Sequence, residues 1–279
     1  MPELPEVETI VRTYRPRLEG RRIVAFESQW PKNVAPSAAH ARRALRGQLI
    51  ERLARRGKFI VFHLGDGSHL LVHLRMSGRF EWAAEHERPP AHVRATWDLD
   101  DGNRLLFCDA RKFGRITHAA DLAAATAGLG PEPLGRGFTA GVLATLLRER
   151  RRQIKPLLLD QSLIAGLGNI YTDEALFRAG LHPTRVASQL SAGEVERLHE
   201  AIRYVLRLAI RNHGTSIDWI YPGGWMQNRL MVYGRTGEPC RRCGTQIEGL
   251  RIAQRGTHVC PRCQRRRARR RTAGRGART

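Results

Sequence analysis

Four cysteines near the carboxyl end of the chain have the spacing of a metal site. Cys240, Cys243, Cys260 and Cys263 form the pattern C-x2-C-x16-C-x2-C. This spacing is typical of four thiolates around one tetrahedral Zn²⁺, which leaves no position open for a substrate. Two disulfides are the competing interpretation, and they are rare in cytoplasmic proteins. We therefore expect one structural Zn²⁺, and we expect the remaining Cys108 to be a buried thiol in an apolar strand.

The chain opens with a second chemically notable pair, Pro2 and Glu3, directly behind Met1. If Met1 is removed, Pro2 presents a secondary amine whose unperturbed pKa is about 8. Such an amine can be neutral at the working pH. Taken alone, however, a Met-Pro start indicates only a processed terminus.

Lysine is scarce, which draws attention to each lysine that remains. Only Lys32, Lys58, Lys112 and Lys155 are present among 48 basic side chains, and the others are arginine. Arginine stays protonated near neutral pH, whereas a lysine can release its proton if its pKa is lowered. Each lysine is therefore a candidate for proton chemistry, although chance retention in an arginine-rich chain is the simpler interpretation.

Composition indicates a globular protein with an anionic partner. The 279 residues suffice for one large or two ordinary domains, and the net charge is +22. Residues 265–279 hold eight arginines and no acid, so the rest of the chain still carries +14. Nucleic acid is the favoured partner, and a membrane surface is less favoured. No apolar run approaches about 18 residues and no signal peptide is evident, so we expect a cytoplasmic protein.

The elements that would position these residues differ between the two halves of the chain. Residues 4–15 predict a helix with Val7, Ile10, Val11 and Tyr14 on one face, ended near residue 15 by Pro16. Pro2 and Glu3 would lie at its N-terminus, where the helix dipole favours an anion. Short strands follow from 21 to about 118, including a hairpin over 93–109 whose turn is Asp101-Gly102. Strands without intervening helices predict an antiparallel β-sandwich.

Helical patterns dominate after a glycine- and proline-rich segment. Thr139 is a predicted N-cap, Gly180 a predicted C-cap, and 191–214 reads as one long helix. The "AGLGN" segment resembles the turn of a helix–turn–helix-type clamp on a nucleic-acid backbone. The sequence thus predicts an α+β fold, namely a β-sandwich with an N-terminal helix followed by a helical domain with a helix–turn–helix-type clamp and a β-hairpin zinc finger. The expected boundaries are 1–120, linker 121–137, 138–235, zinc finger 236–264 and a disordered tail 265–279.

Eight segments, in this order, resemble one enzyme family. They are "PELPEVET", "RRGKFIVFHL", "HLRMSGRF", "DARKFGR", "LGPEPL", "IKPLLLDQSLIAGLGNIYTDEALFRAGLHP", "VYGRTGEPCRRCG" and "AQRGTHVCPRCQ". Together with the zinc spacing they resemble the formamidopyrimidine-DNA glycosylases, bifunctional base-excision repair enzymes, from residue 2 to about 264. The opening "PELPEVE" favours this group over the endonuclease-eight-like sister group. The resemblance implies that the clamp in 138–235 is a helix-two-turn-helix.

The resemblance implies catalytic roles for four residues. Pro2 would attack the sugar C1′ of the damaged nucleotide, and the iminium so formed would act as an electron sink for β- and δ-elimination. Glu3 would protonate the opening sugar. Lys58 would donate a proton during elimination and contact a phosphate, and Arg255 would bind phosphate and assist δ-elimination. An ordinary lysine at a strand start is the alternative for Lys58.

The resemblance also implies how the damaged base leaves the duplex. Met76 would fill the vacated space, Arg111 would bind the orphaned partner base, and Phe113 would wedge the stack. Core packing is the alternative for Met76 and Phe113, but both lie in glycine-flanked turns. By the same resemblance, the remaining phosphate contacts would come from His73, Asn169 and Tyr233, together with His92 and Arg150.

Two departures from the family pattern stand out. Ala110 and Lys112 replace residues expected in the "DARKFG" turn, but neither is a wedge residue. The loop between Gly214 and Tyr233, expected to cap an oxidised purine, is shorter than usual by about four residues. Its aromatic residues would stack on the flipped base or pack beneath the loop; they are Trp219, Tyr221 and Trp225. We therefore expect slower excision of 8-oxoguanine than of ring-opened purines.

Two other functions fit part of the sequence. A non-catalytic, zinc-containing nucleic-acid-binding protein would share the charge and the zinc hairpin, but it would not explain Pro2, Glu3 or Lys58. The same enzyme chemistry with a preference for oxidised pyrimidines is the second, favoured by the short loop. The partner in the main interpretation is damaged double-stranded DNA, and we expect a monomer because one chain holds the whole site.

Overall fold

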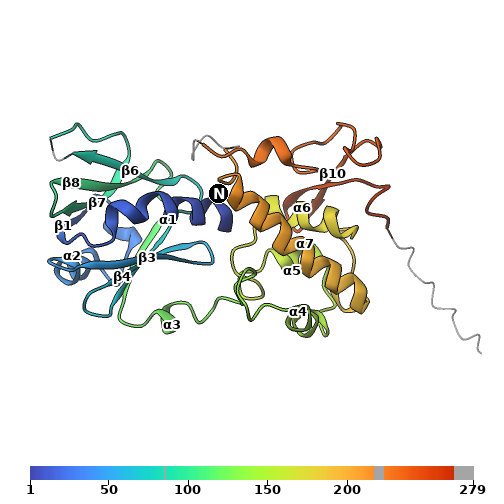
Figure 1. Ribbon diagram of the computed structural model, residues 1–279, viewed down its shortest axis with the longest axis horizontal. Coiled ribbons are helices and arrows are strands. Elements are labelled where there is room, and N and C mark those ends of the chain that lie inside the picture. Colours follow the sequence, from blue (N-terminus) through green and yellow to red (C-terminus); the bar gives the residue numbers. More distant parts are fainter. Residues whose placement is uncertain (85, 217–222, 267–279) are drawn as a thin grey trace, which may run out of the picture.

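The computed structural model describes residues 1–84, 86–216 and 223–266. A β-rich domain and a helical domain lie side by side, and the N-terminus is located between them (Figure 1). Helix α1 (Leu4–Leu18) lies along the β-rich domain and begins where the two domains meet. The α+β fold predicted from the sequence is confirmed.

Helix α1 has the predicted apolar face but a different end. Val7 and Val11 are fully buried, as the periodicity predicts. The helix continues through Pro16 to Leu18, so the prediction that it ends near residue 15 was wrong. Leu18 is fully buried, which contributes about 2 kcal/mol. The carboxylate of Glu19 also accepts the backbone N–H of Leu53 at 2.8 Å, and these contacts offset the hydrogen bond that Pro16 lacks.

The β-rich domain consists of two sheets that pack face to face. One sheet has four antiparallel strands in the order β1-β7-β8-β6, with bounds β1 (Ile23–Ser28), β6 (Gly78–Ala84), β7 (Val93–Leu99) and β8 (Asn103–Asp109). The other has the order β2-β9-β5-β4-β3, with bounds β2 (Val34–Ala35), β3 (Ile50–Arg56), β4 (Phe59–Leu64), β5 (His69–His73) and β9 (Arg115–Ala119). Phe62 and Trp97, one from each sheet, stack with ring centroids 6.3 Å apart.

Two details of this domain depart from a purely antiparallel sandwich. The short strand β2 pairs with β9 in parallel. Helix α2 (Ala38–Leu45) interrupts the run of strands that the sequence predicted, and Ser37 caps it by accepting the N–H of His40. Its burial of Ala41 and Leu45 explains why so short and arginine-rich a segment stays helical.

The predicted hairpin over 93–109 is confirmed as β7 and β8. Ala95, Trp97 and Leu99 are buried, and the residues between them are half-exposed, as the alternation predicts. Gly102 adopts φ 76° in the turn, a conformation that favours glycine.

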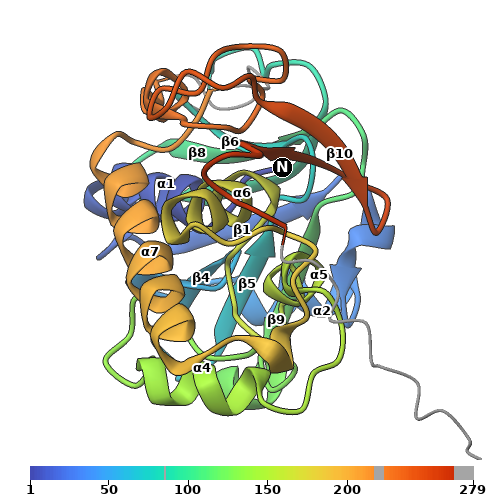
Figure 2. The same ribbon diagram turned by 90° about the vertical axis from the view of Figure 1, so that its right-hand side faces the viewer.

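The helical domain follows the segment predicted as a linker, which itself contains the short helix α3 (Leu122–Ala125). Its other helices are α4 (Ala140–Leu147), α5 (Ile154–Leu158), α6 (Asn169–Ala179) and α7 (Ala192–Arg211), with 3₁₀ turns at Ala187–Gln189 and Met226–Arg229. A further 3₁₀ turn, Pro31–Asn33, lies between β1 and β2 of the β-rich domain. Thr139 caps α4 and Gly180 ends α6 at φ 68°, as predicted. Strands β10 (Glu248–Ile252) and β11 (Arg255–Val259) form the zinc hairpin, which lies on the opposite side of α6 from α7 (Figure 2).

The sequence pattern of "IKPLLLDQSLIA" predicts a helix over this whole segment, and that prediction was wrong. Only the first five residues of "IKPLLLDQSLIA" are helical, and the rest form turns that lead to Gly168. Asp160 causes this break, because its carboxylate accepts the N–H and the hydroxyl of Ser162 in place of a helical pattern. No described helix is both long enough and apolar enough to cross a bilayer.

Candidate active site

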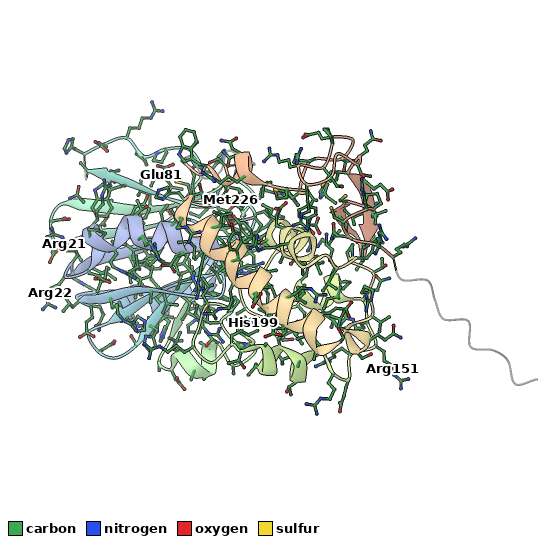
Figure 3. All side chains as sticks on the ribbon, turned by 45° about the vertical axis from the view of Figure 1, so that its right-hand side comes forward. Arg21, Arg22, Glu81, Arg151, His199 and Met226 are labelled. Atoms are coloured by element: carbon green, nitrogen blue, oxygen red, sulfur yellow. The ribbon has the colours of Figure 1, made fainter. Side chains whose placement is uncertain are left out.

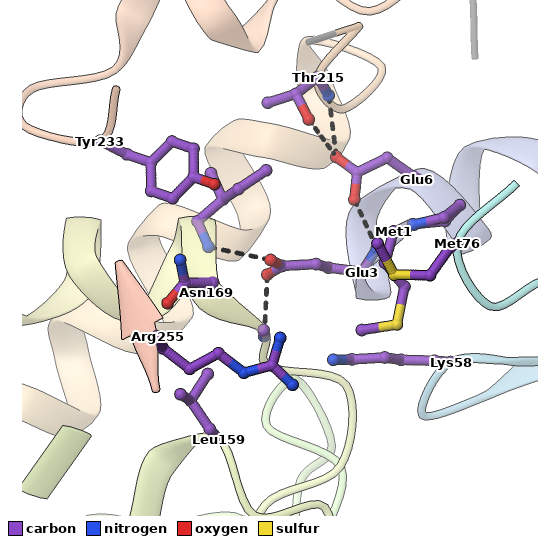
Figure 4. A pocket seen from close by; sticks show the side chains of 13 residues that line it. Met1, Glu3, Glu6, Lys58, Met76, Leu159, Asn169, Thr215, Tyr233 and Arg255 are labelled. Carbon is purple, nitrogen blue, oxygen red and sulfur yellow. Dashed lines mark hydrogen bonds between the residues drawn. The ribbon is translucent and has the colours of Figure 1, made fainter. Parts of the chain in front are cut away.

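A cavity of about 350 Å³ lies where the two domains meet (Figure 4). Seven residues predicted from the sequence line it, namely Pro2, Glu3, Lys58, Met76, Asn169, Tyr233 and Arg255. They come from the start of α1, the β3–β4 and β5–β6 loops, the start of α6, the segment after the last 3₁₀ turn and the zinc hairpin. Arg111, Phe113, His73, His92 and Arg150 lie outside the cavity lining.

Glu3 occupies the centre of the cavity, against the N-terminus of α6. Its carboxylate accepts the backbone N–H groups of Gly168 at 2.8 Å and of Ile170 at 2.9 Å. These are unpaired donors of the first helical turn, so the side chain acts as an anion at a helix N-terminus. A β-carbon on Gly168 would overlap the Glu3 carboxyl group, so only glycine fits there.

Burial nevertheless dominates the protonation of Glu3. Loss of solvent raises its pKa to about 7, against the opposing effect of the Lys58 ammonium and the α6 N–H groups. A carboxyl group with this pKa can hold a proton near neutral pH and also release it. Such a group is suited to general acid and base catalysis.

Lys58 faces Glu3 across the cavity (Figure 4). It follows Gly57 in the two-residue turn between β3 and β4, and Gly57 adopts φ 57°. Burial lowers the pKa of Lys58, while Glu3 and Glu6 oppose that effect. Glu132 fixes the turn by pairing with Arg55 at 2.8 Å and with Arg56 at 3.2 Å. The position of Lys58 is thus fixed by contacts of the neighbouring residues of the β3–β4 hairpin.

Pro2 is buried beside Glu3, and Met1 also lines the cavity. The main chain is fixed directly after it, because the N–H of Leu4 donates to the carbonyl of Gly166 at 3.0 Å. Removal of Met1 would therefore release the Pro2 nitrogen inside the cavity.

Glu6 is a buried carboxyl group that the sequence analysis missed. It accepts the N–H of Glu3 at 2.8 Å, the N–H of Thr215 at 2.8 Å and the hydroxyl of Tyr171. Burial raises its pKa. Glu6 thus joins α1 to α6 and to the loop after α7. Its position three residues after Glu3 at a helix start is a capping-box signal that could have revealed it.

Arg255 reaches the cavity from the start of β11, and a buried ion pair holds that strand in place. The ammonium of Lys155 contacts the Asp173 carboxylate at 2.6 Å and donates to the carbonyl of Gly256 at 2.9 Å. Asp173 also accepts the N–H of His258 at 2.9 Å. Since both charges of the pair are fully buried, the zinc hairpin cannot shift without exposing or unpairing them.

Asn169 and Tyr233 are positioned by similar contacts. The side-chain amide of Asn169 donates to the carbonyl of Gly256 at 3.0 Å, which leaves its second N–H available. The buried Glu174 carboxylate accepts the N–H groups of Val232 and Tyr233, each at 2.9 Å. Burial raises the pKa of Glu174.

The four predicted cysteines converge at the end of the zinc hairpin. Their sulfur atoms all lie within 4.8 Å of one another, with Sγ–Sγ distances of 3.5 Å and 4.0 Å between individual pairs. Four Zn–S bonds of about 2.3 Å require sulfur separations of about 3.8 Å in a tetrahedron. The thiols are free and too far apart for disulfides, so the set fits one structural Zn²⁺. Cys108 is fully buried in the sheet, as predicted.

Two neighbouring loops carry the predicted wedge residues. Phe113 is 49% exposed, which contradicts a core-packing role, and the Arg111 guanidinium lies 5.2 Å from its ring centroid. Met76 is half-buried at the cavity. The fully buried Asp109 connects the two loops, because it accepts the hydroxyl of Ser77, the N–H of Arg111 and the N–H of Gly114.

Comparison with known proteins identifies the family. Three family models match: the formamidopyrimidine-DNA glycosylase N-terminal domain over residues 1–116, the H2TH domain of the same family over 129–220, and a zinc finger found in FPG and IleRS over 237–266. The chain is 46% identical to the formamidopyrimidine-DNA glycosylase of Chloroflexus aurantiacus, across 95% of this chain and 98% of that protein. The same identity holds for the Herpetosiphon aurantiacus protein, across 95% and 100%.

The chain belongs to the formamidopyrimidine-DNA glycosylase family.

Solved structures agree with this assignment. The Lactococcus lactis Fpg in complex with DNA containing an abasic site is 38% identical, with a TM-score of 0.89 over 95% of this chain and 100% of that one. A MutM structure in complex with DNA containing carbocyclic 8-oxo-G is 39% identical, with a TM-score of 0.90 over the same shares.

Three residues with predicted phosphate contacts do not line the cavity of this glycosylase. His73 is buried, and its Nδ1 accepts the N–H of Arg75 at 3.0 Å. Burial lowers the pKa of His73 to about 3, so the ring is neutral and carries its proton on Nε2. His92 is exposed, and its carbonyl accepts the N–H of Asp109 at 2.9 Å. Arg150 is exposed beyond α4.

The loop expected to cap the base is only partly described. Trp219 and Tyr221 lie outside the described residues, as does the part of the tail beyond residue 266. Trp225 is 64% exposed, so it does not pack beneath the loop. Gly224 leaves no room for a side chain against the backbone of Gly214.

Proposed function

We propose that the protein is a bifunctional DNA glycosylase and abasic-site lyase that excises oxidised purines from double-stranded DNA. The observation that carries the proposal is the convergence of Pro2, Glu3, Lys58 and Arg255 on one cavity. The known family supports the reaction class, and the cavity supports the assignment of roles to these four residues.

The first step forms a covalent bond between protein and sugar. After Met1 is removed, the lone pair of the Pro2 nitrogen attacks C1′, the bond from C1′ to the base breaks, and the base leaves with the bonding electrons and gains a proton. The Pro2 nitrogen then loses its own proton. Glu3, whose pKa of about 7 lets it hold a proton, donates to the sugar ring oxygen as the C1′–O bond opens to an iminium.

The second step breaks the DNA strand. The iminium withdraws electrons, so C2′ loses a proton and the 3′ phosphate leaves by β-elimination; a second proton loss expels the 5′ phosphate by δ-elimination. Lys58, whose pKa is lowered by burial, can exchange protons in these steps. Arg255 would stabilise the charge of the departing phosphate. Hydrolysis of the imine frees Pro2.

The lesions bound in related structures favour oxidised purines as substrates of this protein. One Lactococcus lactis structure is a complex with Fapy-dG containing DNA, and a MutM structure holds carbocyclic 8-oxo-G. Met76, Arg111 and Phe113 would fill the gap left by the flipped nucleotide. The exposure of Phe113 supports this role, since exposed wedge side chains insert between base steps.

Borohydride trapping tests this function. Reduction of the iminium would link the protein irreversibly to a duplex that carries 8-oxoguanine opposite cytosine, and also to an abasic-site duplex. We expect adducts on both, mapped by mass spectrometry to Pro2. Adducts on the abasic duplex alone would indicate a changed base preference. Tight binding without any adduct, with Met1 shown to be absent, would indicate a non-catalytic DNA-binding protein.

Lesion preference is the second proposal, and it rests on the short loop between Gly214 and Tyr233. We expect a lower single-turnover rate on 8-oxoguanine than on a ring-opened purine, because a shorter loop offers fewer contacts to the flipped base. Rates should be measured on matched duplexes at saturating enzyme. Equal rates on both lesions would contradict this proposal, and faster excision of an oxidised pyrimidine would favour the alternative substrate class.

We also place the protein in the bacterial cytoplasm, associated with the nucleoid through its substrate. The four zinc thiolates support this, because they require a reducing compartment. A monomer is expected to suffice, since one chain supplies every residue that lines the cavity.

A further inference from the structure

A second basic concavity lies on the outer face of α7 and has a volume of about 740 Å³. We call it the α7 groove. Six arginines line it, namely Arg178, Arg197, Arg203, Arg207, Arg211 and Arg242. His199 lines it as well, and Figure 3 labels this residue on α7. The only carboxylate among the lining residues is Glu200.

Most of these arginines have no anionic partner. Arg203 donates to the carbonyls of Pro133 and Gly135, each at 3.0 Å, so it has a structural role. The other five are exposed, and no ion pair joins them to a carboxylate within the described part of the chain. Like charges gathered in a concave surface raise the local positive potential, which favours a polyanionic ligand.

Aromatic rings orient two of the guanidinium groups. The Arg178 guanidinium lies 3.4 Å from the ring centroid of Tyr204, and the Arg242 guanidinium lies 4.6 Å from that of Phe177. A stacked guanidinium keeps its N–H groups in a fixed plane, which matches the oxygen geometry of a phosphate. Tyr204 is itself 42% exposed, so part of its surface is open to a ligand.

The α7 groove is separate from the catalytic cavity. No residue lines both. Helix α6 has Asn169 at its first turn, beside the cavity, and Arg178 in its last turn, beside the groove. Nine residues at 1.5 Å each separate these ends by about 14 Å. Figure 2 shows α7 and the zinc hairpin on opposite sides of α6.

We propose that the α7 groove binds a second nucleic-acid strand through its phosphates while the cavity holds the damaged duplex. A basic groove with an exposed aromatic ring is the arrangement that binds single strands, because phosphates pair with arginine and bases stack on the ring. An acidic protein segment would satisfy the charges but would make no use of Tyr204.

The test uses the full-length protein with its cavity already filled. An unlabelled short duplex containing a stable abasic-site analogue is added in excess, and a fluorescein-labelled 15-residue thymidine oligonucleotide is then titrated by anisotropy. We expect the preformed complex to bind the oligonucleotide. The variant R197E/R207E/R211E should bind it at least about tenfold more weakly, and the slope of log K against log salt should fall by about two, since three phosphate contacts are lost.

A matched control separates a specific groove from general charge. R22E/R42E/R43E changes the net charge equally but lies in the β-sandwich domain, and Figure 3 shows Arg22 at the far end of that domain from the helices. This control should weaken binding by less than about threefold. Equal thermal melting curves would establish that all variants are folded, and R197Q/R207Q/R211Q replaces the charge-reversed variant if that protein unfolds.

Three results would overturn the proposal. The preformed complex could fail to bind the oligonucleotide, or the control could weaken binding as much as the groove variant does. A 15-residue polyglutamate that competes as strongly as the oligonucleotide would assign the groove to an acidic protein segment. None of these results depends on catalysis, so they leave the proposed glycosylase activity untouched.

Discussion

Glu3 is subject to two opposing influences whose balance sets its protonation. The N–H groups of α6 and the Lys58 ammonium favour the carboxylate, whereas complete burial favours the neutral acid. Burial prevails and raises the pKa to about 7. The acid form therefore predominates below that pH and is lost above it. Because the unfolded chain releases this proton already near pH 4.5, the free energy of unfolding should decrease as pH rises from about 4.5 to about 7.

The rate of base excision should follow this titration. If Glu3 donates a proton to the sugar, the single-turnover rate on 8-oxoguanine should fall above about pH 7 with the slope of one proton. E3Q should lower the rate by about 10²–10⁴, the usual contribution of a general acid, and should abolish that falling limb. If the rate of E3Q still fell above about pH 7, the titration would belong to another group.

The four lysines show that residue type alone does not predict whether a lysine lines the cavity or makes contacts elsewhere in the fold. Lys58 lines the cavity, Lys155 forms a fully buried ion pair, and the ammonium of Lys112 lies 4.3 Å from the ring centroid of Trp30. Lys32 lies near the same ring, at 5.7 Å. One lysine therefore lines the cavity and is proposed to be catalytic, whereas the other three have contacts elsewhere in the fold.

At the scale of elements, Asp109 connects the two loops that carry the proposed wedge residues. D109N would place an amide NH₂ against the N–H of Gly114 or the N–H of Arg111, where no acceptor remains. An unsatisfied buried group costs about 1–3 kcal/mol, so excision from duplex DNA should slow by about fivefold to 100-fold. Borohydride trapping on a single-stranded abasic oligonucleotide should change little, because no stack has to be wedged.

D101N is the matched control for this prediction. Asp101 lies in the turn at the other end of the same β7–β8 hairpin, where its carboxylate accepts the N–H of Asn103 on the surface. Its substitution should leave both rates unchanged. A loss of single-strand trapping in D109N equal to the loss of duplex excision would indicate a collapsed cavity and not a displaced wedge.

The contact between α6 and the zinc hairpin depends on Asp173. D173N removes the charge that compensates Lys155, and breaking a buried pair in this way costs about 3–5 kcal/mol. Denaturant unfolding should detect this loss. In the folded fraction, Arg255 should be displaced, so products of δ-elimination should decrease more than those of β-elimination. The variant K155M/D173L removes both charges and should recover the free energy of unfolding. If it does not, the hydrogen bonds to β11 contribute more to stability than the compensation of charge.

At the scale of the molecule, α1 holds the two domains together. Leu4 packs in the core of the helical domain, whereas Val7, Ile10 and Val11 pack in the core of the sandwich. Glu6 adds hydrogen bonds to Tyr171 and Thr215 of the helical domain. The first six residues therefore supply both the proposed nucleophile and the contacts that fix the cavity around it.

Zinc should be needed for DNA binding but not for the fold of the sandwich. The core around the cysteines contains few buried residues, namely Phe177, Val232, Cys240, Ile247 and Cys260, which is too small to fold without a metal. Chelation should therefore increase hydrogen exchange across 236–264 and abolish DNA binding, while exchange across 93–109 stays slow. Reconstitution with Zn²⁺ should reverse both effects. A zinc hairpin that remained protected after chelation would contradict this prediction.

Patterns within short stretches of the sequence were sufficient to predict the zinc cysteines, the β7–β8 hairpin, and the caps of α4 and α6. The family motifs are likewise visible in the linear sequence. Turn chemistry, capping and metal ligation act over a few residues, so their signals survive in the linear chain. The end of α1, by contrast, was decided by the burial of Leu18, which no local pattern reveals.

Only the tertiary structure decided the environment of the proposed catalytic residues. Glu3 meets the N–H groups of Gly168 and Ile170, more than 160 positions away in the chain, and their approach excludes the solvent that would keep its pKa low. Glu6, Asp109 and Asp173 are ordinary acids in the sequence, and they become critical because packing buries them against partners from other elements. Desolvation is a property of the assembled cavity. For that reason the sequence predicted which groups react but not their protonation.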